Sequence, residues 1–242
     1  MTDWMEDTDA AWLAPPGGDA AGAVVVLADV GEPAGADRFA WGDALFAHGI
    51  AVVAPRHADP WWTDRSGSSN PANAATAEAI VLRTAEMAVT RYGRVAIAGA
   101  GAGGHGALRI AYKHPRRFPV VAAGRPAIDC HALLDRWRPP AIEVPVEAVA
   151  ALRDRYGGDA ERARQDSATL HIHPLNWPRN QRFDCPPADA WWEGCDRLRM
   201  KLSSLGVPHD ADLENDQTAE SALTQTAAWI ADRLAAEARR VP

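Results

Sequence analysis

The sequence has little cysteine. Only three of its 242 residues are cysteines, Cys130, Cys185 and Cys195. An odd number of cysteines in a chain of this length does not form a disulfide framework, because a chain this long can bury a sufficient core without covalent links. This usage is typical of proteins from a reducing compartment, so we expect a cytoplasmic location.

The sequence also lacks a long apolar run. No stretch approaches the roughly 20 apolar residues that a membrane-spanning helix needs. The first residues carry the acidic side chains of Asp3, Glu6, Asp7 and Asp9 instead of the basic flank and apolar run of a secretory signal. We therefore expect neither a signal peptide nor a membrane partner.

An excess of basic residues is absent as well. The formal net charge is −7 and the isoelectric point is near 5.6, which gives no electrostatic reason to bind nucleic acid phosphates. A hydrophobic share of 47% beside 24% charged residues is typical of a soluble globular protein. We expect one domain over residues 1–242, with a homo-oligomer as an open alternative.

Tyrosine and phenylalanine are scarce, with three and four copies, whereas tryptophan occurs ten times. Two sites are adjacent pairs, Trp61-Trp62 and Trp191-Trp192. Neighbouring side chains on a strand point to opposite faces, so such a pair cannot bury both indoles on one face. We expect Trp61 and Trp62 to line a cleft, with packing against a neighbouring segment as the alternative.

Short apolar strands alternate with helical patterns along most of the chain. The strands are expected at residues 23–27, 50–54, 95–98, 120–123, 182–185 and 208–213. The helices are expected at residues 38–48, 72–92, 107–112, 189–205 and 218–236. This alternation predicts an α/β fold with a mainly parallel sheet flanked by helices. The pattern weakens over residues 129–178, where prolines punctuate short helical pieces, and we expect a cap-like insertion there.

The stretch from Val95 to Ala107 is the most informative part of the sequence. A strand runs into a turn in which Gly99, Gly101 and Gly103 occupy the three defining positions of G-x-S-x-G, and a helix follows. In a nucleophile elbow of this pattern the backbone turns sharply and the neighbours of the middle residue must be small. The spacing therefore predicts an elbow with residue 101 at its tip.

With the run Gly103-Gly104-His105-Gly106-Ala107, then Lys113-His114-Pro115 and Phe118, the sequence resembles the esterase D branch of the α/β hydrolases. The resemblance extends, more weakly, to Asp189 and to Trp191-Trp192-Glu193-Gly194. It implies an α/β-hydrolase fold and ester hydrolysis by a Ser-His-Asp triad, with Asp189 as the triad acid.

The departures from this pattern concern the catalytic groups. Gly101 stands where the family has serine, and Glu220 aligns with the catalytic histidine. Asp29 lies near the expected oxyanion hole, where its charge would repel a developing oxyanion. The resemblance thus implies a degenerate triad at Gly101, Asp189 and Glu220 that cannot form an acyl-enzyme efficiently.

We therefore expect an esterase-like protein that is inactive as a hydrolase and binds a small ligand or a protein partner in its vestigial cleft, without a cofactor or metal. The triad positions should converge in one pocket near Trp61. The other residues expected to line this pocket are Trp62, Ala102, Asp29 and Cys130.

Two other functions remain open at this point. The first is an active hydrolase with a relocated nucleophile, such as the thiol of Cys130 or a water ordered by Asp189. The second is dinucleotide binding, because Gly99, Gly101 and Gly104 also fit the pattern G-x-G-x-x-G, which holds a pyrophosphate at a helix N-terminus. Arg125, which follows the next strand, is a candidate to bind a 2′-phosphate. The position of the turn argues against this site, because two strands precede it and the dinucleotide fingerprint belongs to the first strand.

Histidines give weaker signals. His171 and His173 share one face of an extended segment and could begin a zinc site, but no H-E-x-x-H or C-x-x-C accompanies them. We favour a polar pair in a loop bounded by prolines. His105, one turn into the elbow helix, is expected to pack locally because the sequence places no hydroxyl or thiol beside it.

Overall fold

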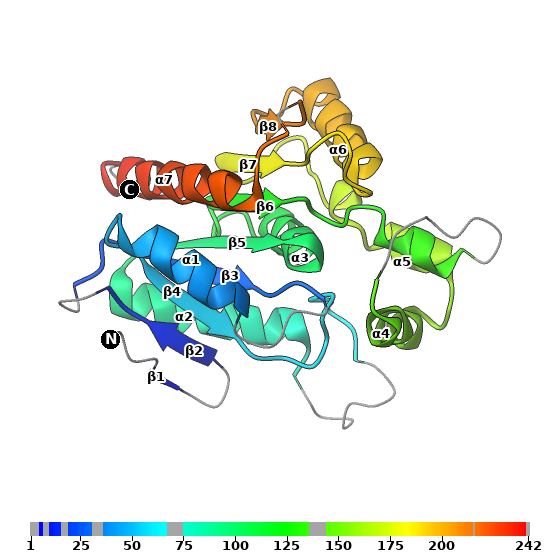
Figure 1. Cartoon of the computed structure of the whole chain (residues 1–242), viewed down its shortest axis with the longest axis horizontal. Coiled ribbons are helices and arrows are strands. Elements are labelled where there is room, and N and C mark those ends of the chain that lie inside the picture. Colours follow the sequence, from blue (N-terminus) through cyan, green and yellow to red (C-terminus); the bar gives the residue numbers. More distant parts are fainter. Residues whose placement is uncertain are drawn as a thin grey trace.

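The computed structural model describes residues 5–6, 10–15, 19–30, 36–66, 75–135, 144–214 and 216–240. Within them the strands form a single eight-stranded sheet in the order β1-β2-β4-β3-β5-β6-β7-β8 (Figure 1). The strands are β1 (Met5–Glu6), β2 (Ala10–Leu13), β3 (Ala23–Leu27), β4 (Ala51–Pro55), β5 (Val95–Ala100), β6 (Val120–Gly124), β7 (Asn180–Asp184) and β8 (Asp210–Asp212). The strands from β4 to β8 are parallel, which confirms the predicted sheet.

The two N-terminal strands were not predicted. β2 pairs antiparallel with β4, with Ala11 opposite Ala54, and β1 adds a further antiparallel pair at the edge. Both strands are short, and the four apolar residues of β2 are buried because β2 pairs with β4 and packs in the core. Their assignment therefore depends on tertiary contacts.

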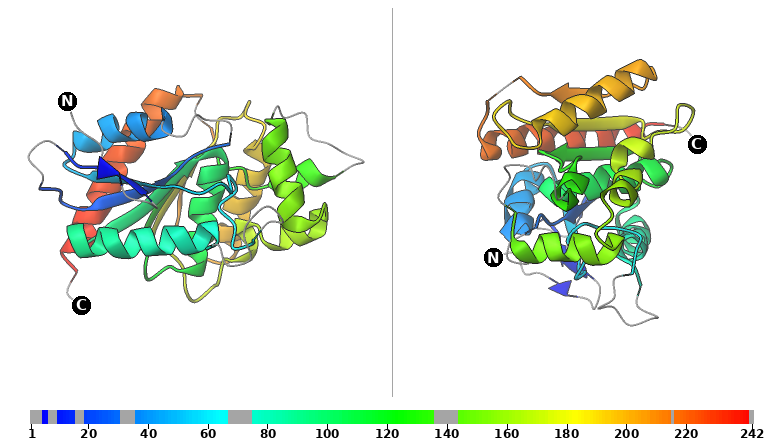
Figure 2. Two further views of the ribbon diagram at one scale, coloured as in Figure 1. Left: turned by 90° about the horizontal axis from the view of Figure 1, so that it is seen from below. Right: turned by 90° about the vertical axis from the view of Figure 1, so that its right-hand side faces the viewer.

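Helices cover both faces of the sheet (Figure 2). One face carries α1 (Ala36–Phe46) and α7 (Ala219–Ala238), whose apolar side chains pack on Val24, Val52 and Ala98. The other face carries α2 (Ala77–Tyr92), α3 (Gly101–Lys113) and α6 (Trp192–Ser204). The parallel strands are buried from both sides, which explains why they read as continuous valine and alanine runs.

Two helix starts differ from the prediction. α2 begins at residue 77 because Thr76 caps it, its hydroxyl accepting a hydrogen bond from the Ala79 N–H at 3.2 Å. The expected start at residue 72 lies outside the described residues. α3 begins at Gly101, six positions earlier than expected, because the glycines of its first turn allow close packing rather than breaking the helix.

The expected insertion forms short helices at one end of the molecule, at the right of Figure 1. They are η1 (Cys130–Leu134), α4 (Val146–Tyr156), α5 (Ala160–Gln165) and η2 (Ala168–Leu170). The Trp61 indole N–H donates to the Ala148 carbonyl at 2.8 Å and so ties α4 to the loop after β4.

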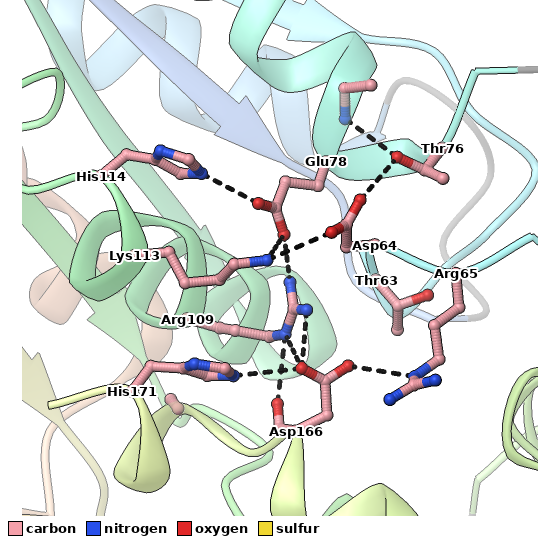
Figure 3. A network of polar contacts seen from close by, with 12 residues as sticks. Thr63, Asp64, Arg65, Thr76, Glu78, Arg109, Lys113, His114, Asp166 and His171 are labelled. Carbon is pink, nitrogen blue, oxygen red and sulfur yellow. Dashed lines mark hydrogen bonds and ion pairs between the residues drawn. The ribbon is translucent and has the colours of Figure 1, made fainter.

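A buried charge network holds the insertion against α2 and α3 (Figure 3). The guanidinium of Arg109 is 1% exposed and pairs with Glu78 at 2.6 Å and with Asp166 at 2.7 Å. Burial opposes ionisation of Glu78, but a hydrogen bond from His114 and the charges of Arg109 and Lys113 lower its pKa to about 2. Since each charge has a close partner, this cluster is a structural tie between three segments.

Candidate functional site

The strand-to-helix corner predicted from the glycine pattern is present. β5 ends at Ala100, Gly101 has a left-handed backbone with φ +51°, and α3 starts there. A Cβ at Gly99 would lie 2.5 Å from the Gly103 carbonyl carbon, and a Cβ at Gly103 would overlap the Leu27 carbonyl. Glycine is thus required beside the corner by close backbone approach, as in a nucleophile elbow.

The carboxylate of Asp29 lies directly against this corner. Its Oδ1 accepts hydrogen bonds from the backbone N–H of Val30 and of Ala102, both at 2.7 Å. A Cβ at Gly101 would overlap the carboxylate group itself. Asp29 therefore fills the space that a nucleophilic side chain would need and occupies two N–H donors at the start of α3.

This placement revises the expected role of Asp29. In an elbow of this type, the N–H after the nucleophile and an N–H from the loop after the third strand form the oxyanion hole. Here those two positions are Ala102 and Val30. Asp29 does not merely repel an oxyanion from a distance, because its own carboxylate is the bound anion. The helix N-terminus stabilises a negative charge at this point.

The remaining triad positions lie at the same edge of the sheet. Asp189 lies in the turn between β7 and α6, and its Oδ1 accepts a hydrogen bond from the Trp191 N–H at 2.9 Å. Glu220 is exposed in the first turn of α7. The convergence of these two residues with Gly101 in one pocket stays a prediction.

A cavity of about 730 Å³ lies at the carboxyl ends of the central strands, between α1 and α7. The described residues that line it include Ala100, Gly124, Asp184 and Glu220, but not Gly101, Asp189 or Trp61. Ligand sites of α/β sheets are found at this edge, so the position favours binding.

Asp184 is the residue at this site that the sequence analysis missed. It ends β7, is 6% exposed and lines the cavity. No residue in the described part of the chain donates a hydrogen bond to its carboxylate, and burial raises its pKa to about 6. The available signal was its place near the carboxyl end of the strand predicted at residues 182–185, because such sites form at this edge of a parallel sheet.

Arg125 lies beside Asp184 and has an unusual backbone. Its φ is +42°, a left-handed conformation that non-glycine residues rarely adopt, and its N–H donates to the Asp184 carbonyl at 2.7 Å. Its side chain is exposed and lines the cavity. Strained backbone of this kind is concentrated at functional sites, because a well-ordered surrounding structure must hold it.

The two tryptophans expected to line a cleft are packed in the core instead. Trp61 is 1% exposed and Trp62 is 3% exposed. The Trp62 indole N–H donates to the Ala28 carbonyl at 2.9 Å, and its Cβ lies where a side chain at Gly106 would be. A left-handed φ of +56° at Trp62 lets both indoles turn inward, which regular strand geometry would not allow.

Two further candidates are buried in forms unsuited to catalysis. Cys130 is 4% exposed, and burial raises the pKa of its thiol to about 12, so little thiolate is present near neutral pH. Burial lowers the pKa of His105 to about 3, and its Nε2 accepts a hydrogen bond from the Ala168 N–H at 3.1 Å. His105 thus joins α3 to the insertion as a neutral side chain.

The histidine pair is divided between two local roles. The His171 Nε2 lies 3.1 Å from Asp166 Oδ1 within the charge network, and the His173 Nδ1 accepts from the Leu175 N–H at 3.1 Å. Among the described residues, no group of three or more His, Cys, Asp or Glu side chains is placed to hold a metal ion. No helix in that part of the chain is long and apolar enough to cross a membrane.

Comparison with known proteins gives the fold. No family model and no curated protein sequence matches the chain. An S-formylglutathione hydrolase from Agrobacterium tumefaciens superposes with a TM-score of 0.66 at 17% identity, over 96% of this chain and 94% of that one. The serine hydrolase FphF from Staphylococcus aureus gives 0.70 at 12% identity, over 96% and 97%. An esterase from Pyrobaculum calidifontis gives 0.70 at 16% identity, over 96% and 85%. The chain therefore has the α/β-hydrolase fold, similar to esterase-type structures.

Proposed function

We propose that this protein is a non-hydrolytic member of the esterase-type α/β-hydrolase fold that binds a small molecule at the carboxyl edge of its sheet. The relation between Asp29 and Gly101 is the observation that supports this most strongly. Gly101 provides no nucleophilic side chain. The Asp29 carboxylate occupies the space of that side chain and accepts the hydrogen bonds that acyl transfer would need.

Two independent defects argue against ester hydrolysis. A residue without a side chain cannot attack a carbonyl. An oxyanion hole contributes about 3–4 kcal/mol of transition-state stabilisation per donor, and here both candidate donors already hold a carboxylate. The hydrolases and esterases with similar structures have a scaffold for acyl chemistry. Here residue 101 has no side chain, and among the described residues the N–H groups of Val30 and Ala102 already bind the Asp29 carboxylate.

The alternatives have less support. A relocated thiol nucleophile at Cys130 is disfavoured by its burial and its raised pKa. A dinucleotide at the glycine turn would bring a pyrophosphate to the N-terminus of α3, where the Asp29 carboxylate already binds the Ala102 N–H. Like charges at that point would repel each other.

A binding role fits the cavity. Its volume of about 730 Å³ lies within the range of small-molecule pockets, and it combines apolar walls with a few polar groups. A buried carboxylate without a hydrogen-bond partner costs stability, so its presence is more easily explained by binding than by folding. This reasoning favours a small ligand over a protein partner as the occupant.

Esterase assays test the proposal. The purified protein should hydrolyse p-nitrophenyl acetate and butyrate no faster than its Asp189→Asn variant or the buffer, and a fluorophosphonate probe should label no residue. An active serine hydrolase assayed in parallel is the positive control. Hydrolysis that is abolished by Asp189→Asn, or stoichiometric labelling of one side chain, would show that a catalytic site operates.

A further inference from the structure

We propose that the cavity between α1 and α7 binds a small organic molecule that carries an ammonium group, with the Asp184 carboxylate as its counter-ion. This inference depends on the proposed binding function and adds the chemical class of the ligand. Three features of the cavity support it: an unpartnered buried acid, an excess of acidic groups and an apolar wall.

The unpartnered acid is Asp184. Its side chain is more than nine-tenths buried, and within the described residues its carboxylate receives no hydrogen bond and makes no ion pair. The buried carboxylates of the charge network show the contrast, because Glu78 and Asp166 are each paired with Arg109 at 2.6–2.7 Å. A ligand ammonium in the cavity would supply Asp184 with the partner that the fold supplies to the others.

The acidic excess comes from the rim. Asp43 on α1 and Glu220 on α7 are exposed and line the cavity together with Asp184. Among the described lining residues the basic side chains are one guanidinium, that of Arg125, and the imidazole of His48. Three carboxylates against one guanidinium give the entrance a negative potential, which attracts cations and disfavours anions. The charges of Arg182 and Arg125 lower the pKa of Asp184, but burial outweighs both and leaves the pKa raised. Within the described residues neither guanidinium forms an ion pair with Asp184, and Arg182 pairs with Asp210 instead.

The apolar wall of the cavity indicates the chemistry of the ligand beyond its ammonium group. Trp41, Leu223 and several alanines of α1 and α7 line the cavity. These side chains suit a hydrocarbon or aromatic body, and an indole can also stabilise a nearby cation. The combination of a carboxylate at the sheet edge and apolar helix faces is typical of a site for an arylalkyl or alkyl amine.

Calorimetry with three probes of similar size tests this inference. At pH 8, 2-phenylethylamine should bind at least tenfold more tightly than 2-phenylethanol, and 3-phenylpropionate should show no binding. Asp184→Asn should reduce the affinity for the amine by tenfold or more. This variant keeps the side-chain volume and removes a buried charge, so it should fold. Asp232→Asn, an exposed carboxylate on α7 outside this cavity, is the matched control and should bind the amine as the natural protein does.

Three outcomes would overturn the inference: no heat with the amine at millimolar concentration, equal binding of amine and alcohol, or amine binding that Asp184→Asn leaves unchanged. Preferential binding of the acid would assign the cavity to Arg125 instead. Each of these results leaves the absence of esterase activity intact, so failure of the ligand class is distinguishable from failure of the proposed function. Hydrolysis of the nitrophenyl esters would overturn the latter alone.

Discussion

The carboxylate of Asp29 fills the space that any side chain at residue 101 would enter. The two residues are far apart in the sequence, and they meet because β3 and β5 are neighbours in register, with Leu27 opposite Gly99. A side chain at residue 101 and the carboxylate of Asp29 therefore cannot both occupy this space. This coupling can be measured.

A double-mutant cycle on Gly101→Ser and Asp29→Ala measures it. In the natural background the serine must displace the carboxylate from two N–H donors and adopt a φ of +51°, so we expect a loss of about 3 kcal/mol in the free energy of unfolding. In the Asp29→Ala background the same substitution should cost about 1 kcal/mol. Denaturant unfolding of the four proteins gives the coupling, and additive effects would contradict the overlap.

Asp29→Ala by itself should open an anion site. Removal of the carboxylate leaves the N–H groups of Val30 and Ala102 without their acceptor, and acetate can replace it. At acetate concentrations ten times its dissociation constant, the variant should gain about 1.4 kcal/mol. Thermal unfolding in acetate and in chloride of equal ionic strength measures the gain. Acetate should not stabilise the natural protein or Asp29→Asn, which keeps an acceptor oxygen. An equal stabilisation of either protein would show that acetate does not act at these two N–H groups.

Asp184→Asn should stabilise the protein at neutral and alkaline pH. Burial raises the pKa of Asp184 from 3.8 to about 6, so the folded state holds its proton where the unfolded state has lost it. The unfolding free energy therefore falls as the pH rises from below 4 to above 6, by about 3 kcal/mol in total. The asparagine side chain of the Asp184→Asn variant cannot ionise, so the unfolding free energy of this variant does not fall in this way. Urea unfolding should show a gain of about 2–3 kcal/mol at pH 8 that disappears below pH 4, and a gain independent of pH would contradict the assignment.

Glu78→Gln should have the opposite pH dependence. The pKa of Glu78 is lowered from 4.5 to about 2, so its ionised form stabilises the fold above pH 4.5 and this contribution is lost as the pH falls toward 2. We expect a loss of about 3–5 kcal/mol at pH 7, because Arg109 loses a buried partner.

Glu86→Gln is the control for this prediction. Glu86 lies on the same helix and pairs with Arg117 at 2.6 Å, but its side chain is 63% exposed. Its replacement should cost less than about 1 kcal/mol at any pH. If the two variants lost equal stability at pH 7, the buried network would not have the structural role assigned to it.

The sequence by itself determined most of the sheet. Short valine and alanine runs such as residues 23–27 are typical of strands covered on both faces, and the observed strand has the same bounds. The glycines at 99, 101 and 103 likewise determined the strand-to-helix corner, because close backbone approach excludes a Cβ there. In both cases the information is local, since the pattern of neighbouring residues carries it.

The tertiary structure decided what the corner contains. Three features depend on segments that are distant in the sequence: the contact of Asp29 with Ala102, the inward turn of Trp61 and Trp62, and the burial of the Asp184 carboxylate at the cavity. Local patterns do not encode such distances, because side-chain position follows from strand register and helix packing. The sequence thus identified a strand-to-helix corner with glycine at its tip, and only the folded chain showed that a carboxylate from another loop lies against it.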